Sequence, residues 1–383
     1  MIYLDNAATT ARKPPEVAKA VARAIDGFGG AGRGAHGASL DAGLAVFRAR
    51  ERLVRLLGAA GPSRIAFACN ATEALNAAVL GLLEPGAHAV TTAASHNSAL
   101  RPLYRMQDEH GCGLSIVDVG RDGSLDYDAF DAAFRPDTKL AVVTHASNLT
   151  GDVYDIARLA RISHDHGALL VADVAQTAGL LDIDIERDGI EVAAFTGHKS
   201  LYGPQGTGGL AVASHVEVRP FKVGGTGARS YDRSQPAQMP DRLEAGTLNA
   251  HGIAGLEAGL AYIEERGVAS LAAQATQLAR RFERGVRAVA GVRVYGGGGD
   301  AGRCGIVALN VGACDSSTVG DILNAEFGIC TRAGAHCAPL MHEALGTREQ
   351  GAVRFSFSSF NTEADVDAAI RAVVEIAAEV EGR

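Results

Sequence analysis

Lys199 is the first residue whose surroundings suggest chemistry. It follows the apolar run 192–195 and the residues Thr196, Gly197 and His198, and it precedes a glycine-rich turn at 203–208. Partial burial at the end of a strand lowers the pKa of an ammonium group, and an amine in that state can form an imine with an aldehyde cofactor. A surface lysine that follows a strand has the same local sequence, so a second residue must support the interpretation.

Asp173 supplies that support, because it follows five apolar residues at 168–172. A buried carboxylate is costly unless it meets a cation. The protonated pyridine nitrogen of pyridoxal 5′-phosphate (PLP) is such a cation, and PLP enzymes pair it with an acidic residue while a lysine forms the Schiff base. The alternative role of Asp173 is to cap the helix that follows the strand.

The segment 64–83 could hold the phosphate of such a cofactor. Residues 64–68 have the pattern of a buried strand, and an apolar stripe at helical spacing follows at 75–83. Asn70 and Glu73 have the spacing of a capping box, so the N–H groups and the Thr72 hydroxyl at the helix start can receive an anion. Ordinary helix caps have the same sequence. The glycine run 27–32 matches a dinucleotide fingerprint but follows a helical pattern, which excludes that interpretation.

Cys337 is a candidate nucleophile in a loop-like segment at 331–339. Arg332 and His336 lie near it in sequence. Positive neighbours favour the thiolate, which is the nucleophilic form of cysteine.

A zinc site is an alternative for this segment, formed by Cys330, His336, Cys337 and His342. The spacing matches no paired motif of structural zinc, so we predict no metal. The six cysteines are irregularly spaced in a long chain, which is typical of free thiols and not of a disulfide framework. The pattern around Cys69 and Cys304 predicts buried thiols that act as small hydrophobic side chains.

A sheet must bring these residues together. Apolar runs alternate with helical patterns, and the clearest later runs are 140–143, 168–172, 192–195 and 209–212. This alternation predicts a mainly parallel sheet covered by helices. Ligands of such sheets bind beyond the carboxyl ends of the strands, so we expect Asn148, Asp173 and the turn 196–199 to meet in one crevice.

The pattern changes after about residue 250, and 383 residues exceed what one hydrophobic core usually holds. A long Ala/Leu/Arg helix, a glycine loop at 296–299, short strands and a capped last helix from Thr362 follow. The sequence therefore predicts a large PLP-binding α/β domain at 15–250. It also predicts that residues 1–14 and 251–383 form a smaller α+β domain.

Composition limits the partners. The net charge of −8, with acidic and basic residues interleaved, provides no basic surface for nucleic acid or for an anionic membrane. The N-terminus has no basic region followed by an apolar run, and no apolar run is long enough to span a membrane. We therefore expect a cytoplasmic protein whose partner is a small molecule.

These segments together resemble the class V aminotransferase superfamily, and specifically its cysteine desulfurase and selenocysteine lyase branch. The resemblance covers nearly the whole chain, with the motifs in family order. The matching segments are 3–10, 70–76, 95–98, 147–148, 172–176, 196–199, 244–247, 332–337, 354–356 and 360–362.

The resemblance implies the type I fold of PLP-dependent transferases, with PLP bound as a Schiff base to Lys199. Asp173 would pair with the ring nitrogen, and His96 would stack on the ring and shuttle protons. Gln176 and Asn148 would contact the cofactor or the substrate.

The resemblance also implies a homodimer with shared active sites. The phosphate would be held by Ala71, Thr72, Thr196 and His198, with Thr247 from the other subunit. Arg354 would clamp the substrate carboxylate through two hydrogen bonds, a geometry that lysine cannot reproduce. The Cys337 thiolate would attack the substrate sulfur.

The function implied is an L-cysteine desulfurase that forms L-alanine and a persulfide on Cys337. L-Selenocysteine is a second candidate substrate, and a sulfur acceptor protein is a candidate partner. Ser95 and Ala335 stand where many relatives have an acidic residue and a second histidine, which leaves the acceptor open. Two alternatives remain: a class V aminotransferase, lyase or epimerase with an incidental Cys337, and a non-catalytic PLP-fold subunit that binds partners.

Overall fold

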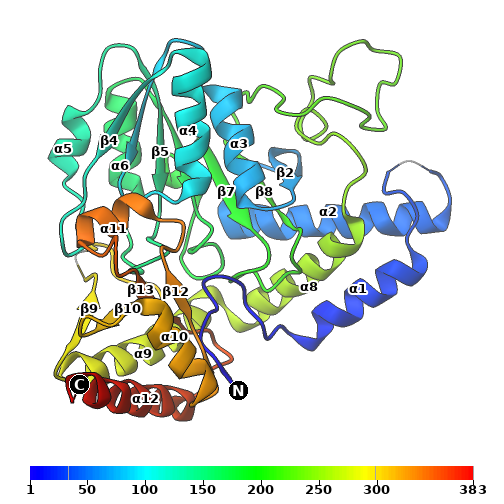
Figure 1. Ribbon diagram of the computed structural model, residues 1–383. Helices are drawn as coiled ribbons and strands as arrows, with labels where there is room; N and C mark the ends of the chain where they lie inside the picture. Colours follow the sequence, from blue (N-terminus) through cyan, green and yellow to red (C-terminus); the bar gives the residue numbers. More distant parts are fainter. Residues whose placement is uncertain (33, 298, 383) are drawn as a thin grey trace.

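A helix-covered sheet forms the upper part of the molecule in Figure 1, and a smaller layer of strands and helices lies below it. The computed structural model describes residues 1–32, 34–297 and 299–382. In this part of the chain the large sheet has seven strands, in the order β2-β8-β7-β6-β5-β3-β4. The strands are β2 Ile65–Ala68, β3 His88–Thr92, β4 Gly113–Val117, β5 Thr138–Thr144, β6 Leu169–Asp173, β7 Val192–Thr196 and β8 Gly208–Val212. The predicted fold class, α/β with a mainly parallel sheet, is confirmed.

Strand β8 runs antiparallel to both of its neighbours, β7 and β2, whereas the other adjacent strands are parallel. The sheet is therefore mainly parallel, as predicted, and the run 209–212 forms its antiparallel strand. Parallel neighbours need a long crossover, usually a helix. The described residues 197–207 contain no helix, so the chain turns back directly after Lys199.

Both faces of this sheet are buried, because alternate residues of each strand enter different cores. Val143 and Leu170 belong to one core, and Val142 and Val171 belong to the other. The first core includes helices α2, α6 and α8, and the second includes α3 and α4. The helices and the 3-10 turn around the sheet are α1 Pro15–Gly27, α2 Gly37–Leu57, η1 Pro62–Arg64, α3 Ala71–Leu82, α4 Asn97–His110, α5 Tyr127–Ala132, α6 Ile156–Asp165, α7 Ile185–Asp188 and α8 Ala250–Arg266.

The smaller layer is built on an antiparallel sheet with the order β12-β13-β10-β9 in the described residues. Its core contains Phe282, Phe355 and Phe357, and the ring of Phe282 packs against each of the other two rings. The short strand β1 pairs with β11 in parallel, so the N-terminus joins this layer. The elements are β1 Ile2–Tyr3, α9 Val268–Arg287, β9 Val292–Tyr295, β10 Ile306–Val311, α10 Ser316–Ala325, β11 Ile329–Cys330, β12 Arg332–Gly334, α11 Pro339–Leu345, β13 Ala352–Ser356 and α12 Glu363–Glu381.

The start of α12 agrees with the sequence prediction, whereas the break between α8 and α9 does not. Thr362 and Asp365 form the expected capping box at the start of α12. The single long helix expected after residue 250 is instead two helices, α8 and α9, because Gly267 has a φ of 79° between them. A residue in the left-handed region cannot continue a right-handed helix. Gly298 of the predicted glycine loop lies outside the described residues, and the domain boundaries at 14 and 250 stay a prediction.

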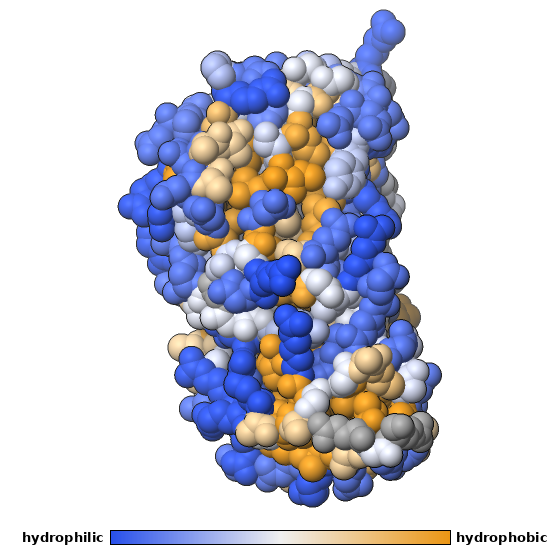
Figure 2. All heavy atoms as spheres, turned by 60° about the vertical axis from the view of Figure 1, so that its left-hand side comes forward, coloured by the Kyte–Doolittle hydropathy of each residue, from blue (hydrophilic) through white to orange (hydrophobic). Residues whose placement is uncertain are grey.

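Strand β4 forms one edge of the large sheet. Figure 2 turns this side of the molecule forward and shows hydrophobic surface gathered in its upper half between hydrophilic margins. Leu114 and Ile116 of β4 are partly exposed. None of the described helices is both long enough and apolar enough to cross a membrane.

Gly208 allows the start of α3 to approach the end of β7. A Cβ atom at this position would lie 2.7 Å from the Cα of Asn70 and 2.8 Å from the carbonyl oxygen of Phe195. We predict that Gly208→Ala lowers the free energy of unfolding by about 1–3 kcal/mol, because backbone atoms must move apart. Denaturant titration measures this, and Gly27→Ala is the control because a Cβ there meets nothing within 4 Å. Equal stability of the two variants would contradict the prediction.

Candidate active site

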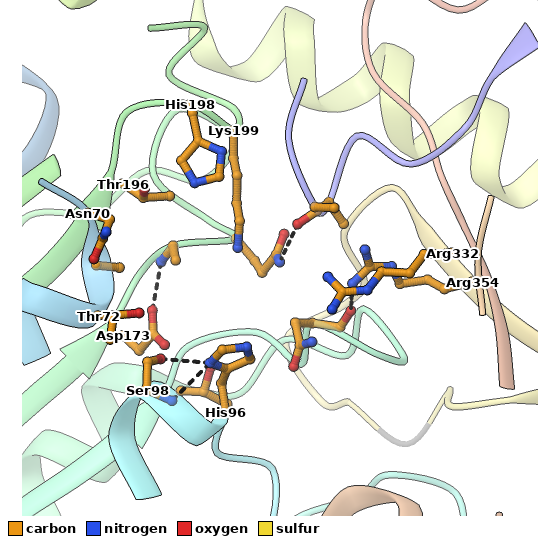
Figure 3. Close-up of a pocket in the computed structure, with 17 residues that line it drawn as sticks. Asn70, Thr72, His96, Ser98, Asp173, Thr196, His198, Lys199, Arg332 and Arg354 are labelled. Atoms are coloured by element: carbon orange, nitrogen blue, oxygen red, sulfur yellow. Dashed lines mark hydrogen bonds between the residues drawn. The ribbon is translucent and has the colours of Figure 1, made fainter. Parts of the chain in front are cut away.

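A cavity of about 260 Å³ opens where the strands of the large sheet meet the smaller layer (Figure 3). Strands β5, β6 and β7 direct their carboxyl ends toward it, helices α3 and α4 begin beside it, and β12 and β13 close it from the smaller layer. Its lining residues are Ala7, Ala8, Asn70, Ala71, Thr72, His96, Ser98, Thr144, Asn148, Asp173, Ala175, Gln176, Thr196, His198, Lys199, Arg332 and Arg354. The crevice predicted from the sheet pattern is therefore present, and it contains every predicted site residue of this chain except Cys337 and Thr247.

Lys199 extends into this cavity from the turn after β7 (Figure 3). Burial lowers the pKa of its amine to about 8, and the positive charges of Arg354 and Arg332 act in the same direction. The negative charge of Asp173 opposes them. The amine is therefore neutral in a large fraction of molecules near pH 8, as imine formation and proton transfer both require.

Asp173 is the last residue of β6, and its side chain is only 5% exposed. One carboxylate oxygen accepts a hydrogen bond of 3.0 Å from the backbone N–H of Ala175. Burial raises the pKa of the carboxyl group, and the Ala175 bond and the charge of Lys199 oppose that effect. An ionised carboxylate in this place requires a further cation, and the cavity leaves room for a bound one.

Two buried polar atoms beside Lys199 have no hydrogen-bond partner in the described structure, Oγ1 of Thr196 and Nδ1 of His198. Burial, aided by the charge of Lys199, lowers the pKa of His198 to about 4. The first turn of α3, which contains Ala71 and Thr72, lies at the same end of the cavity. Asn70 caps this helix by accepting the N–H of Glu73. These groups could together hold a phosphate.

His96 caps helix α4 and has a defined tautomer. Its Nδ1 accepts hydrogen bonds from the backbone N–H of Ser98 at 3.0 Å and from the Ser98 hydroxyl at 2.7 Å. Burial lowers the pKa of His96 to about 4, and the charges of Lys199 and Arg332 contribute. The imidazole is therefore neutral at physiological pH, with its proton on Nε2.

Arg354 of β13 is 1% exposed and is held from two sides. It donates to the carbonyl oxygen of Asn148 and to the carboxylate of Asp5, both at 2.8 Å, and its Nε has no partner in the described structure. Burial lowers the pKa of its guanidinium group, which Asp5 opposes. Gln176 is also held in place, because its amide donates to the carbonyl oxygen of Ala7 at 3.1 Å.

Arg332 is a lining residue that the sequence interpretation missed as a binding group. We considered it only as a neighbour of Cys337, although it opens the matching segment 332–337. In the structure it lies beside Arg354 at the end of the cavity opposite Asn70 (Figure 3). Asp5, which orients Arg354, was likewise not predicted, and no local pattern distinguishes its role.

Cys337 lies outside the lining of the cavity, in the turn between β12 and α11, and is exposed. Its Sγ is 4.0 Å from a guanidinium nitrogen of Arg332. The six cysteines are free, as predicted, and Cys304 is buried. The prediction of a buried Cys69 is wrong, because this residue lies in the exposed turn between β2 and α3, where its backbone N–H bonds to Glu73.

Thr247 lies in a second hollow together with Phe47, Arg50 and Thr226, apart from the Lys199 cavity of the same chain. A role at the phosphate of another subunit stays a prediction. In the described part of the chain, no three His, Cys, Asp or Glu side chains are close enough together to hold a metal ion. The geometry therefore gives no support to the zinc alternative at Cys330, His336, Cys337 and His342.

The aminotransferase class-V family model matches residues 2–369. The chain therefore belongs to this family, whose enzymes depend on PLP. The cavity fits that cofactor: among the described residues the buried carboxylate of Asp173 accepts one backbone N–H and forms no ion pair, and the atoms of Thr196 and His198 that have no partner there belong to residues that line the same cavity as the start of α3.

Relatives define the branch of the family. Probable cysteine desulfurases of Methanothermobacter thermautotrophicus and Halobacterium salinarum are 32% and 34% identical, over 98% of this chain and 94% and 91% of their own lengths. The apo structure of a cysteine desulfurase from Thermococcus onnurineus NA1 matches with a TM-score of 0.92 and 31% identity, over 99% of this chain and 95% of that one. The chain is a cysteine desulfurase homologue, and the predicted resemblance is confirmed.

The pKa of Lys199 gives a prediction for cofactor-free protein. An amine-selective reagent modifies the neutral amine, so the rate of Lys199 labelling should rise with pH around a midpoint near 8, below the 10.4 of an ordinary lysine. Asp173→Asn removes a charge that stabilises the ammonium form, so the midpoint should move to lower pH. Peptide mapping by mass spectrometry measures it, with Asp367→Asn on the surface as the control. An upward shift in Asp173→Asn would contradict the assigned electrostatics.

Proposed function

We propose that this protein is a PLP-dependent L-cysteine desulfurase, which forms L-alanine and a persulfide on Cys337. The observation that supports this proposal most directly is the position of Arg332. Its side chain lines the Lys199 cavity, and one of its guanidinium nitrogens also lies 4.0 Å from the sulfur of Cys337. A thiol at the edge of a cavity that fits PLP can reach the sulfur of a bound substrate. The names of the relatives support the same reaction.

The substrate carboxylate is assigned to the guanidinium groups at one end of the cavity. Arg354 is oriented by Asp5 and by the carbonyl oxygen of Asn148, so its other N–H groups are presented in a fixed direction. Arg332 adds a second positive charge at the same end. Arg354, Arg332 and Asn148 would hold an amino acid by its carboxylate. The side chain of the bound amino acid would then be directed toward Cys337.

When bound, PLP supplies an electron sink for the bond changes at the substrate. Lys199 holds the cofactor and moves the proton at the substrate α-carbon, since an amine with a pKa of about 8 can both accept and return it. His96 presents its Nε2–H as a hydrogen-bond donor and proton relay. Asp173 maintains the charge on the ring nitrogen.

These groups account for each bond that the net reaction forms or breaks. The Cys337 thiolate forms a bond with the substrate sulfur, the carbon–sulfur bond of L-cysteine breaks, and the carbon receives a proton. L-Alanine leaves and a persulfide remains on Cys337, ready for transfer to an acceptor protein or thiol. L-Selenocysteine is proposed as a second substrate, because it has the same shape and a more acidic side chain.

A homodimer is part of the proposal. Large hydrophobic side chains on one side of the chain are exposed: Leu40, Leu44 and Phe47 on α2, with Val223 and Tyr231 in the loop after β8. Phe47 also lines the hollow that contains Thr247. Covering this surface with a second copy would remove apolar area from water and would bring Thr247 toward the partner's cofactor.

The alternative is a class V aminotransferase, lyase or epimerase, which is favoured by the position of Cys337 outside the cavity lining. Cys337→Ala distinguishes the two. This variant should bind the cofactor and L-cysteine, as judged by the visible absorption spectrum, because Lys199, Asp173 and Arg354 are unchanged. Alanine and bound persulfide should both disappear, whereas the Cys314→Ala control should retain them. Cysteine desulfuration at a wild-type rate in Cys337→Ala, or amino transfer to a keto acid, would support the alternative.

Arg354→Lys tests the carboxylate site. A lysine keeps the positive charge but loses the two-pronged hydrogen-bond geometry, so we predict a rise in KM for L-cysteine of at least about tenfold, from a loss of roughly 1.5–3 kcal/mol. Steady-state alanine formation measures it. Arg281→Lys is the matched control, since this surface arginine binds Asp367 far from the cavity. An unchanged KM would move the carboxylate to another group, with Arg332 as the next candidate.

A further inference from the structure

A buried chain of polar groups lies beneath the turn that contains Cys337. His336 and His342 are each 2% exposed, and their rings lie nearly parallel, at an angle of 12°. His336 Nε2 is 3.1 Å from the carbonyl oxygen of Arg332, and His336 Nδ1 is 3.5 Å from His342 Nε2. His342 Nδ1 is 2.7 Å from the hydroxyl of Thr347. The chain therefore runs from α11 and the residues after it to the strand that contains Arg332.

The carbonyl oxygen of Arg332 ends this chain, and it determines which nitrogen of each histidine ring carries the proton. The carbonyl oxygen of Arg332 can only accept, so His336 Nε2 must donate and the Nδ1 of the neutral ring must accept. His342 Nε2 is then the donor to His336, and His342 Nδ1 accepts the proton of the Thr347 hydroxyl. Burial lowers the pKa of His336 to about 3, and the nearby charges of Arg354 and Arg332 also disfavour the imidazolium form. Burial likewise lowers the pKa of His342.

The turn above this chain needs support. His336 and Cys337 have φ values of 53° and 55°, in the left-handed region that non-glycine residues enter at a cost of roughly 1–2 kcal/mol each. Two hydrogen bonds hold the turn from the cavity side, both of 2.8 Å: Asn148 Nδ2 donates to the carbonyl oxygen of His336, and the N–H of Asn97 donates to that of Cys337. The histidine chain holds it from the opposite side.

We propose that His342, with Thr347, is a positioning residue for Cys337. His342 donates to Nδ1 of His336 and so holds the orientation of that ring, and His336 joins the strained turn to the carbonyl oxygen of Arg332. The guanidinium group of Arg332 and the sulfur of Cys337 are thereby kept in a constant relation to the cavity. His342 is not among the residues that line the cavity, so its effect on sulfur transfer is indirect.

The substitutions separate hydrogen bonding from packing. His342→Leu keeps a buried side chain of similar size but removes both nitrogen atoms, whereas His342→Gln keeps an amide N–H at the reach of Nε2. Thr347→Val removes the hydroxyl that donates to His342 Nδ1, together with the longer contact of 3.5 Å between that hydroxyl and the carbonyl oxygen of His342. His110→Gln is the control, because His110 is exposed at the end of α4.

Two measurements on the holoenzyme test the proposal. In His342→Leu, kcat for persulfide and alanine formation should fall by about tenfold, equivalent to 1.4 kcal/mol, while KM for L-cysteine changes less than about twofold. His342→Gln should recover most of the rate. Hydrogen exchange of the Asn97 and Ala338 amides should accelerate in His342→Leu and stay at the wild-type rate in His342→Gln.

The kinetic measurement rests on the proposed function, and the exchange measurement does not. If the wild-type protein forms no persulfide, the desulfurase proposal fails, and the exchange rates and the ¹⁵N shifts of the histidine rings alone decide on His342. Nε2-protonated rings at both positions in the wild-type protein, with a shift of the His336 Nδ1 resonance in His342→Leu because this acceptor loses its donor, support the proposal. Wild-type kcat and exchange in His342→Leu, or an equal loss in the Gln and Leu variants, would overturn it.

Discussion

The carboxylate of Asp173 is the constraint on which the site depends. It is held at the end of a central strand, it is 5% exposed, and the described protein supplies one backbone N–H and the more distant charge of Lys199. Burying a charge in this way is tolerated only where a cation completes the site. The neighbouring strand brings Lys199 to the same edge, and the reversal of β8 directly after it keeps the turn 197–207 short. In the proposed function, these two groups would define the position and the orientation of the cofactor ring between them.

The charges around this ring are separated along the cavity. Polar atoms of Thr196 and His198 that have no partner among the described residues lie toward the start of α3, whereas Arg332 and Arg354 come from the smaller layer at the other end. Asp5 belongs to the N-terminal segment and pairs with Arg354, so the orientation of the arginine depends on contact between the two ends of the chain. A molecule with a phosphate at one end and a carboxylate at the other can bind in only one direction. This arrangement explains why the site needs both layers of the fold.

The sequence predicted the groups whose role follows from a local pattern. Strand ends identified Asp173 and Lys199, and the cap at Asn70 identified the helix start. A polar residue that directly follows a buried strand has few possible roles in a folded protein. The direction of β8, the break at Gly267 and the exposure of Cys69 depend on turn geometry and on tertiary neighbours, which alternation of apolar residues does not encode. Arg332 lines the cavity only because β12 pairs with β13 beside Arg354. Contacts across 20 or more residues of sequence leave no periodic signal.

In the proposed reaction, Cys337 has to satisfy two requirements that oppose each other. A thiol that receives sulfur inside a cavity must keep a defined position relative to the substrate, whereas a thiol that passes sulfur on must be accessible from outside. The structure combines an exposed side chain with a backbone that is bonded on both sides, to Asn97 and Asn148 and to the histidine chain. Two successive residues in the left-handed region, His336 and Cys337, make this turn tight, and the thiol of Cys337 is exposed. A short, strained and well-supported turn can therefore do what a long mobile loop would do by diffusion, at a smaller loss of conformational entropy when the sulfur is transferred.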